Sequence, residues 1–519
     1  MKRIILKTVI FVLIAAWEPL AAYETGENES IEPAQPRIAV EISDEAAIIL
    51  DGQRYSLSEM IKKSIELNPD IYITRYSAAM ADTGLKKFDS KYSALFNASG
   101  SVSSVSYPEP LYDRYWKKNE SAGASASVAK SFSSGTTVIA GVGHTYSDLN
   151  TGFGPEYDIN NPVVFAAIEQ ELLKNAFGYA ERREKMILEN ETKMQRDAHI
   201  YSISMIALGV IADYWDVVLA RNHLDNSRIM LAETLKVRRI VSEKVDIGLS
   251  EKFEINYWNS LVSSSKASVS QAEQRYRNAM RKLLRDVNVD RKITMQEKVI
   301  LTGAFPEINS GEAIKRAFGK RADYLNAVRE VENAKLSLSI NENAALPSLK
   351  GSFSVSSMDY NIESAGDAYS NTARMKYPGY EAKLSMTYPL NDTGREADER
   401  NAGWIVEQSK KRLESTTRTV KDDVITKIEN ISTGYRLYSE AKEARTQSEL
   451  YYNKMVINLR RGRFAASSVR DALDAFVSCR ETELQLLVGY NLALIEFEVS
   501  KNGLFERYGI DINAYIPKE

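Results

Sequence analysis

Apolar and polar residues alternate along several short stretches of the chain. The alternation is clearest at residues 96–103, 349–356 and 381–390, where serine fills many of the polar positions. A period of two residues predicts strands with one buried face. Such a face packs either on an ordinary protein core or, in a membrane β-barrel, against lipid, with serine and threonine toward a water-filled lumen. The serine-rich polar faces and the tyrosines near the strand ends favour the barrel.

A further pair of alternating stretches lies in the first half of the chain. Residues 122–132 and 136–146 flank the turn Ser133-Ser134-Gly135, and residues 161–172 lead back toward a helical segment. The chain therefore has four predicted strands without this hairpin and six with it. Lipid does not tolerate an open sheet edge, and single-chain bacterial barrels have at least eight strands. If these strands lie in a membrane, several copies of the chain must close the barrel.

Two long segments carry helical patterns. Residues 179–245, 67 positions without a proline, are rich in Ala, Leu, Glu, Lys and Arg. At about 1.5 Å per residue such a helix reaches roughly 100 Å, which is too long for a globular core. In the second segment, apolar residues follow a 4-3-4-3 spacing at Val424, Ile428, Ile431, Tyr435 and Tyr438. That spacing predicts coiled-coil packing of the helices.

The two halves of the chain resemble each other. Residues 59–107 match residues 312–360 at a shift of 253, and Gly248 matches Gly462 at a shift of 214. Because the second shift is smaller, the first half carries 39 additional residues (253 − 214) between positions 107 and 248. An internal repeat of this length indicates a duplicated unit of helix, strands and helical hairpin.

This duplication predicts the organisation of the chain. The expected parts are a first repeat at 55–310, with strands within 95–172 and a helical hairpin turning at 248, and a second at 311–504, with strands within 349–390 and a hairpin turning at 462. We expect residues 505–519 to form a C-terminal tail.

The N-terminus carries an export pattern. Two basic residues precede the apolar run 4–16, and small residues follow at Ala21-Ala22. These features predict a secretory signal peptide at residues 1–22. An uncleaved membrane anchor is the weaker alternative, because a helix needs about 20 apolar residues to span a bilayer. Residues 23–54 are then expected as an acidic periplasmic tail that contains a short strand at 48–50 and an Asp-Gly turn.

Composition argues against an enzyme and against a nucleic-acid-binding protein. The 67 basic and 70 acidic residues give a formal net charge of −3, which offers no attraction for nucleic acid. The single cysteine, Cys479, excludes an intramolecular disulfide and a cysteine-cluster metal site, and is expected to pack on a coiled-coil helix. No catalytic or cofactor motif surrounds the three histidines, His144, His199 and His223. We therefore expect neither catalysis nor a bound cofactor or metal.

Three features resemble the TolC-like family of outer membrane efflux proteins. In the opening helix from Tyr55 to Ile71, Asn68-Pro69-Asp70 is similar to the family's first motif. Residues 169–173 resemble its strand-to-helix step, with Glu171 where proline is usual. The third feature is the pair of helix-turn-helix units around Gly248 and Gly462. The resemblance covers residues 55–504.

This resemblance implies a mixed α and β fold that a homotrimer completes. In the family, each chain gives four strands to a shared transmembrane β-barrel, and long antiparallel helices form a coiled-coil barrel, a tunnel that extends into the periplasm. The protein would be an outer membrane channel of an efflux or secretion system, a passive conduit gated at its periplasmic tip by adaptor and inner-membrane pump partners. The hairpin at residues 122–146 departs from this pattern. It lies beside the barrel or enlarges it to six strands per chain.

The resemblance also implies two sets of functional residues. The tip turns that dock the partners correspond to Gly248, Leu249, Ser250, Gly462, Arg463 and Phe464. The acidic positions that form selectivity rings near the tunnel mouth correspond to Ser468 and Asp471, with Asp474 one turn further on. Three copies of Asp471 near a threefold axis would attract cations, whereas Ser468 lacks the charge of the first ring. The alternative for Asp471 and Asp474 is an ordinary solvated helix face.

A periplasmic coiled-coil adaptor or scaffold with a soluble β domain is the competing function. The joint duplication of strands and helices argues against it, as does a hairpin whose outward face lacks charges. Only the channel requires a homotrimer in contact with outer membrane lipid.

Overall fold

The computed structural model describes residues 47–50, 53–106, 118–150, 157–248, 251–289, 301–360 and 365–517. The predicted signal peptide at 1–22, most of the predicted tail and the Asp51-Gly52 turn lie outside these residues. The short strand expected at 48–50 is present as β1 (Ala47–Leu50), which pairs with β2 (Gln53–Ser56).

Each half of the chain contains short helices, then strands, then two long helices. The first half has α2 (Leu57–Leu67), α3 (Pro69–Ala79), η1 (Met80–Asp82), α4 (Thr83–Ser90), β3 (Leu95–Ser106), β4 (Lys118–Ser131), β5 (Thr136–Asn150), β6 (Tyr157–Glu171), η2 (Ala176–Gly178), α5 (Tyr179–Asp246) and α6 (Lys252–Val287). The second half has α7 (Ser310–Lys320), α8 (Ala322–Ala344), β7 (Ser348–Met358), α9 (Ala365–Ala373), β8 (Pro378–Thr387), α10 (Thr393–Arg460) and α11 (Ala466–Ser500). The short α12 (Leu504–Arg507) and η3 (Ile512–Tyr515) follow.

The element boundaries repeat at the two shifts found in the sequence. The first residues of α2, α3 and β3 lie 253 positions before those of α7, α8 and β7, and those of α5 and α6 lie 214 positions before those of α10 and α11. Both α5 and α10 contain 68 residues, which corresponds to about 100 Å of helix. The internal duplication is therefore confirmed, and the additional residues of the first half contain β4 and β5.

The motif Asn68-Pro69-Asp70 has a local structural role at the start of α3. The Asn68 side chain accepts hydrogen bonds from the backbone N–H groups of Asp70 and Ile71, at 2.8 and 3.0 Å. Pro69 occupies the first helical position, where the missing N–H has no partner to lose, and the Asp70 carboxylate lies near the positive end of the helix dipole. This motif therefore starts a helix and needs no catalytic explanation.

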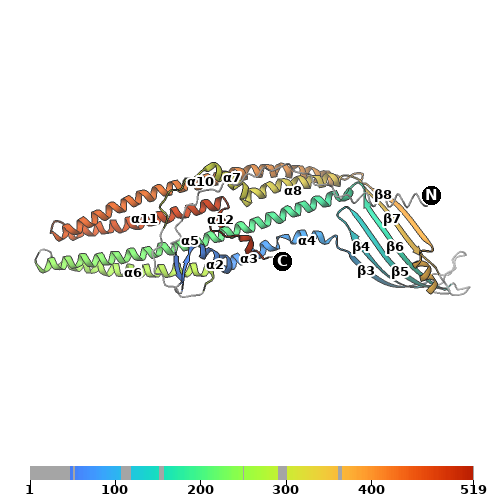
Figure 1. Cartoon of the computed structure of the whole chain (residues 1–519), viewed down its shortest axis with the longest axis horizontal. Coiled ribbons are helices and arrows are strands. Elements are labelled where there is room, and N and C mark those ends of the chain that lie inside the picture. The colour runs from blue at the N-terminus through green and yellow to red at the C-terminus, as the bar shows by residue number, and fades with distance from the viewer. Residues whose placement is uncertain are drawn as a thin grey trace. The chain divides into compact units, whose positions relative to one another are not determined.

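The strands form one antiparallel sheet in the order β3-β4-β5-β6-β7-β8 (Figure 1). β4 pairs with β3 over 12 residue pairs and with β5 over 14. The predicted turn Ser133-Ser134-Gly135 joins β4 to β5, with Gly135 at φ +68°. The inserted hairpin therefore belongs to the sheet, which has six neighbouring strands within the described residues.

The long helices pack as antiparallel hairpins, α5 with α6 and α10 with α11. Val424, Ile431 and Tyr438 of α10 are buried, and Ile428 and Tyr435 between them are partly buried, as the 4-3 spacing predicted. Nearer the sheet, α5 contacts α3 and α4 on one side and α8 on the other, and α8 contacts α10 (Figure 1). The helical layer there has the order α3/α4, α5, α8, α10.

Within the residues that the structure describes, one segment, Ala176–Asp246, is long and apolar enough to cross a membrane by length and composition, but 61% of its most apolar window is buried within the protein. Ile203, Ile211 and Val218 of this segment belong to the largest hydrophobic core, together with residues of α2, α6 and α11. The helix is apolar because it is surrounded by other helices.

The C-terminal segment, expected as a tail, packs against the same core. Leu504, Phe505, Ile510 and Ile512 are buried in it, and the Arg75 side chain of α3 donates to the Tyr515 carbonyl oxygen at 2.5 Å. The apolar side chains after residue 504 account for this docking, because leaving them in water would be unfavourable.

Candidate functional site

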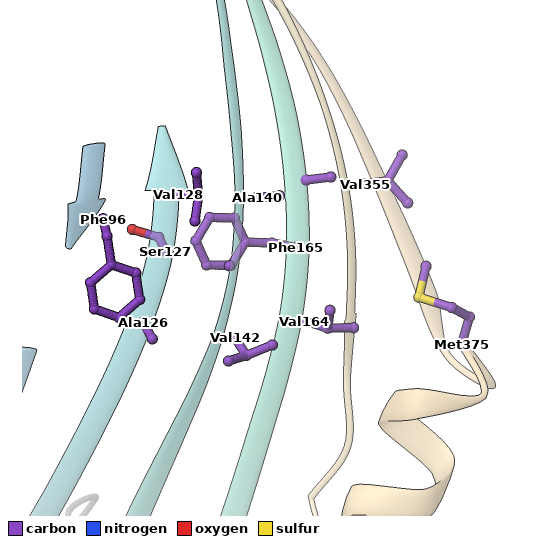
Figure 2. Close-up of a pocket in the computed structure, with 12 residues that line it drawn as sticks. Phe96, Ala126, Ser127, Val128, Ala140, Val142, Val164, Phe165, Val355 and Met375 are labelled. Atoms are coloured by element: carbon purple, nitrogen blue, oxygen red, sulfur yellow. The ribbon is translucent and has the colours of Figure 1, made fainter. Parts of the chain in front are cut away.

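The two faces of the six-stranded sheet differ in chemistry. Neighbouring strands place one uninterrupted row of apolar side chains on one side, which we call the apolar face: Phe96, Val128, Ala140, Ala166, Val355 and Tyr380. In the next row toward the helices, Val138, Ile168, Phe353 and Ala382 continue it on β5 to β8, and the β4 position of this row is Lys130. An open groove runs across this face where alanines lie between larger side chains, with Met375 at one margin (Figure 2).

The opposite side, which we call the serine face, carries mainly small polar residues on β3, β4 and β7, and it also carries Ile139 of β5 and Val163, Phe165 and Ala167 of β6. Its members include Ser99, Ser101, Ser103, Ser121, Ser125, Ser127, Ser352, Ser354 and Ser356. Hydroxyl groups on β3 and β4 form hydrogen bonds across the strands, Ser99 Oγ to Ser125 Oγ and Ser103 Oγ to Ser121 Oγ, each at 2.8 Å. These side chains can exchange hydrogen bonds with water, so this face is suited to an aqueous lumen.

The sheet curves toward the serine face. A Cβ atom placed on Gly141 would lie 2.8 Å from the Ser127 Cβ, and one on Gly143 would lie 3.6 Å from the Ser125 Cβ. Facing Cβ atoms in a flat antiparallel pair are about 4.5–5.5 Å apart, so side chains converge on this side. On the apolar face, a Cβ on Gly100 would have no side-chain atom within 4 Å. The serine face is therefore concave, and glycine makes room where the side chains converge.

The sheet ends in two unpaired edges. Among the described strands, β3 pairs only with β4 and β8 pairs only with β7, and every residue of β3 and β8 is exposed. Exposed edges of this length are templates for pairing with another strand. The helices beside them also carry exposed apolar side chains, such as Ile73 on α3 (63% exposed) and Trp404 on α10 (62%). Unpartnered groups thus occur along both flanks of the chain.

A short helix that the sequence patterns did not reveal lies against β6 and β7. In α9, Tyr369 stacks on His144 with 5.2 Å between ring centroids, and the Thr372 hydroxyl donates to the Pro162 carbonyl oxygen at 3.3 Å. His144 and Pro162 are cross-strand neighbours on the apolar face. Nine residues of mixed polarity give too little periodicity for prediction.

The two predicted tip turns contain left-handed glycines. Gly248 has φ +77° and Gly462 has φ +75°, and a Cβ on either would have open space around it. After α10, the Gly462 N–H bonds to the Leu459 carbonyl and the Arg463 N–H to the Asn458 carbonyl, both at 3.0 Å. This is the Schellman arrangement that ends helices, and glycine is required there by φ alone.

The remaining predicted tip residues are exposed where they are described. Arg463 and Phe464 are exposed, whereas Leu249 and Ser250 lie outside the described residues. Ile247 and Phe253 beside the first turn are each 69% exposed, although neither belongs to the predicted tip residues. Both turns therefore present apolar side chains to the surroundings.

The three predicted constriction residues lie on the first turns of α11. Asp471 and Asp474 lie on its exposed face, opposite the buried residues Val469, Leu473 and Phe476, and Ser468 is half-buried. The Asp474 carboxylate pairs with Arg470, Oδ2 to Nε at 2.7 Å. This partner offsets the charge of Asp474, so Asp471 is the stronger candidate for an acidic ring.

Two internal ion pairs were not found from the sequence. Arg321, 7% exposed, precedes α8 and reaches the carboxylates of Asp323, at 2.7 Å, and Asp423 on α10. Burial opposes ionisation of Asp323, but the adjacent Arg321 guanidinium lowers its pKa below the ordinary value. Asp323 is only two residues away, but Asp423 lies 102 residues from Arg321 on another helix, and no short motif signals that contact.

In the first half, Asp213 of α5 is buried and its Oδ1 lies 2.5 Å from Lys282 Nζ of α6. Burial and a hydrogen bond with Asp286 raise the pKa of Asp213 to about 6, against the opposing effect of Lys282. Because the folded-state pKa is raised, the folded protein holds this proton more tightly than the unfolded chain. Asp213 therefore lowers stability as the pH rises from about 4 to about 6.

The residues considered for catalysis are dispersed. His199 lies on α5, His223 Nδ1 lies 2.9 Å from Glu481 Oε1, and Cys479 is half-buried on α11. In the part of the chain that the structure describes, no group of three His, Cys, Asp or Glu side chains is arranged to hold a metal ion. The features that stand out are surfaces: the two faces of the sheet, its edges, the flanks and the tips.

No family model and no curated protein matches the sequence. Among solved structures, the chain is similar to the outer membrane channel MtrE of Neisseria gonorrhoeae in its open state (TM-score 0.61, 15% identity, 93% of this chain and 96% of that chain). It is also similar to the outer membrane channel CmeC of Campylobacter jejuni (0.61, 12%, 95% and 96%). The third is the outer membrane protein VceC of Vibrio cholerae (0.61, 11%, 88% and 96%).

These matches span nearly the whole of both chains, so they concern the complete arrangement of helices and strands and not one shared motif. At 11–15% identity, the similarity is one of fold. The resemblance to TolC-like proteins inferred from the sequence is confirmed at that level, as is the mixed fold of long helices and an antiparallel sheet. The chain thus has the fold of these outer membrane channels.

Proposed function

We propose that this protein is the outer membrane channel of an efflux or secretion system, a passive trimeric conduit from periplasm to exterior. The observation that carries the proposal is the sheet, with an apolar convex face, a serine-rich concave face and two unpaired edges. In lipid, such a sheet is stable only when its edges are paired in a closed barrel. The fold shared with MtrE, CmeC and VceC supports the same assignment.

Ring closure requires that β8 of one copy pairs with β3 of the next. The helices agree with this arrangement, because α3 and α4 precede β3 on one flank and α10 follows β8 on the other. In both the helical layer and the sheet, one flank of each copy can therefore contact the opposite flank of the next copy. The same head-to-tail contact is repeated around an axis, and the copies form a closed ring when the rotation between them is a whole fraction of a full turn. Ile73 and Trp404 are then buried between copies, which accounts for their exposure in the single chain.

The helical hairpins supply the part of the conduit outside the membrane. Helices of about 100 Å with polar outer faces are too long for a bilayer about 30 Å thick and suit a tunnel through the periplasm. The tips at Gly248 and Gly462 are the proposed docking points for an adaptor and an inner-membrane pump. Exposed Ile247, Phe253 and Phe464 offer apolar contacts for such partners. The channel itself performs no catalysis in this proposal.

We assign Asp471 to a selectivity ring just inside these tips. Three carboxylates near a threefold axis favour cations, and divalent cations bind there most strongly. Asp471→Asn should weaken divalent-cation block of single channels in planar bilayers, whereas Asp474→Asn, which loses a carboxylate already paired with Arg470, should have a smaller effect. Unchanged block in Asp471→Asn would remove this residue from the mechanism.

The test of the function is fractionation followed by conductance measurement. The native protein should sediment with outer membranes, run as a heat-resistant trimer on gels and form channels in planar bilayers. A soluble monomer in the periplasmic fraction would overturn the channel and favour the adaptor or scaffold alternative.

A further inference from the structure

The inserted hairpin determines the width of the sheet. Six strands about 4.8 Å apart and tilted by about 40° cover roughly 38 Å of a barrel's circumference, whereas four would cover roughly 25 Å. The helical layer beneath has four columns, α3/α4, α5, α8 and α10. At 8–10 Å between neighbouring helix axes, four columns cover roughly 32–40 Å. The sheet with the hairpin is therefore as wide as the helical layer that it joins.

The hairpin is fixed to the rest of the protein at its turn. Gln170 Nε2 donates to the Ser134 carbonyl oxygen at 3.0 Å, and the Glu171 N–H donates to the Gly135 carbonyl oxygen at 3.2 Å. At Gly178, just before α5, a Cβ would lie 1.7 Å from the Ser133 carbonyl oxygen. The base of the helical layer thus makes specific room for the turn, which is not expected of a loosely attached accessory hairpin.

In its central rows the hairpin continues both faces of the sheet, and the charged Lys130 of β4, opposite Val138, lies on the apolar side only in the row nearest the helices. Ala124 and Ala126 of β4 and Val142 of β5 extend the apolar face. Ser125 of β4 and Gly143 of β5 face each other on the serine face. Inserted strands that pointed their polar side chains toward lipid would be unstable, because unpaired polar groups are unfavourable there. The alternation fits β4 and β5 as wall strands.

We propose that three copies close an 18-stranded barrel (three times six) whose lumen is as wide as the helical tunnel below, so that the outer membrane segment does not select solutes by size. This proposal rests on the trimeric channel proposed above. Eighteen strands at the same tilt give a backbone diameter of roughly 36 Å, against roughly 24 Å for twelve. Size selection then takes place at the periplasmic tips, and bulky solutes admitted there leave without a second constriction in the barrel wall.

Cysteine labelling of assembled channels tests the strand count. In a Cys479→Ser background, Ser125→Cys places a thiol on the serine face of β4, and Ala124→Cys places one on the adjacent apolar face. Ser354→Cys on the serine face of β7 is the reference, because β7 lines the lumen with or without the hairpin. Single-channel current is measured before and after a large, charged methanethiosulfonate reagent is added.

We expect labelling at Ser125→Cys to reduce the current by an amount within about twofold of that at Ser354→Cys, and Ala124→Cys to leave it unchanged. A response at Ser354→Cys with none at Ser125→Cys would overturn the 18-stranded barrel and leave the channel intact. Absence of channels, or of any response at Ser354→Cys, would overturn the channel and with it the barrel.

Polymer exclusion gives a second measurement. Uncharged polyethylene glycols are added only to the external side, and polymers small enough to enter the lumen lower the conductance. The largest polymer that enters should correspond to a lumen about 1.5 times wider than that of a 12-stranded barrel. A cut-off on the external side that matches a 12-stranded barrel would contradict the proposal.

Discussion

The two halves of the chain reach the same helix boundaries through different contacts. At the start of the second helix, Asn68 caps α3 with its own side chain, whereas Arg321 at the equivalent position before α8 donates to Asp423. The first-half position equivalent to Asp423 is Gly209, 214 residues earlier. The second half therefore has both the arginine and its carboxylate partner, and the first half has neither at the equivalent positions. The duplicated fold has kept its geometry while the stabilising interactions diverged.

A second pair of equivalent contacts has reversed its charges. Asp213 pairs with Lys282 between α5 and α6, and 214 residues later Lys427 pairs with Glu496 between α10 and α11, at 2.7 Å. The long helices differ too, because α5 is enclosed by neighbouring helices whereas α10 lies at a flank. The difference teaches that helix length and register are held by the whole bundle, and that each local contact can change if its partner changes.

The largest expected effect concerns Arg321. Arg321→Ala leaves two partly buried carboxylates without their cation and should lower the free energy of unfolding by about 3 kcal/mol. The corresponding first-half variant, Asn68→Ala, removes only a helix cap and should lower it by about 1 kcal/mol. Thermal denaturation of the purified protein measures both. Equal effects would contradict the idea that the halves use different stabilising interactions here.

The double variant Arg321→Asn with Asp423→Gly introduces the first-half residues, an asparagine and a glycine, at these two second-half positions. It tests whether the asparagine helix cap can replace the ion pair. The double variant should be more stable than Arg321→Asn alone, because it also removes the Asp423 carboxylate that would otherwise lack its cation.

The next effect concerns the exposed flank of α10. Trp404→Asp should lower trimer stability by about 2 kcal/mol at each interface, because a large side chain buried between copies is replaced by a charge. Semi-native gels at increasing temperature report trimer dissociation. Ile247→Asp makes a similar change at the tip, outside the flanks, and should leave the dissociation temperature unchanged. Intact trimers at the normal temperature in Trp404→Asp would argue against the proposed arrangement of copies.

A smaller effect is expected from exchanging the charges of the first-half pair. Asp213→Lys alone brings two ammonium groups together and should be strongly destabilising. Adding Lys282→Glu copies the charge order of the second half and should restore about 1–2 kcal/mol of the free energy of unfolding. Chemical denaturation of the four proteins in this double-mutant cycle gives the coupling. Without any recovery, the two contacts would not be equivalent.

The smallest effect belongs to the tip glycines, which both halves share. Gly248→Ala and Gly462→Ala should each lower the free energy of unfolding by about 1 kcal/mol, because alanine is disfavoured at positive φ. Gly489→Ala is the matched control, since this glycine lies within helix α11, has open space around its Cβ position and should gain up to about 1 kcal/mol. Differential scanning calorimetry compares the three. A loss at Gly489→Ala equal to that at the tips would remove φ as the explanation.

Several features of the fold could be predicted because they depend on residues close together in the sequence. The alternation in residues 349–356 identifies β7, the 4-3 spacing from Val424 identifies the packed side of α10, and the repeat shifts predict which elements are equivalent. Tip glycines also follow from local backbone geometry. The docking of the C-terminal segment and the position of α9 could not be predicted, because their contacts are formed with distant elements.

By itself, the sequence determined the duplicated order of elements, the length of the helices and the two-residue alternation of the strands, since each follows from backbone periodicity. Only the tertiary structure decided that β4 and β5 pair within the six-stranded sheet, that the serine face is concave and that Arg321 meets Asp423. Strand order, curvature and ion pairs between distant helices depend on which surfaces come together in the folded chain, and periodicity carries no information about that. For this reason the hairpin could be predicted as a hairpin, while its place in the sheet had to be observed.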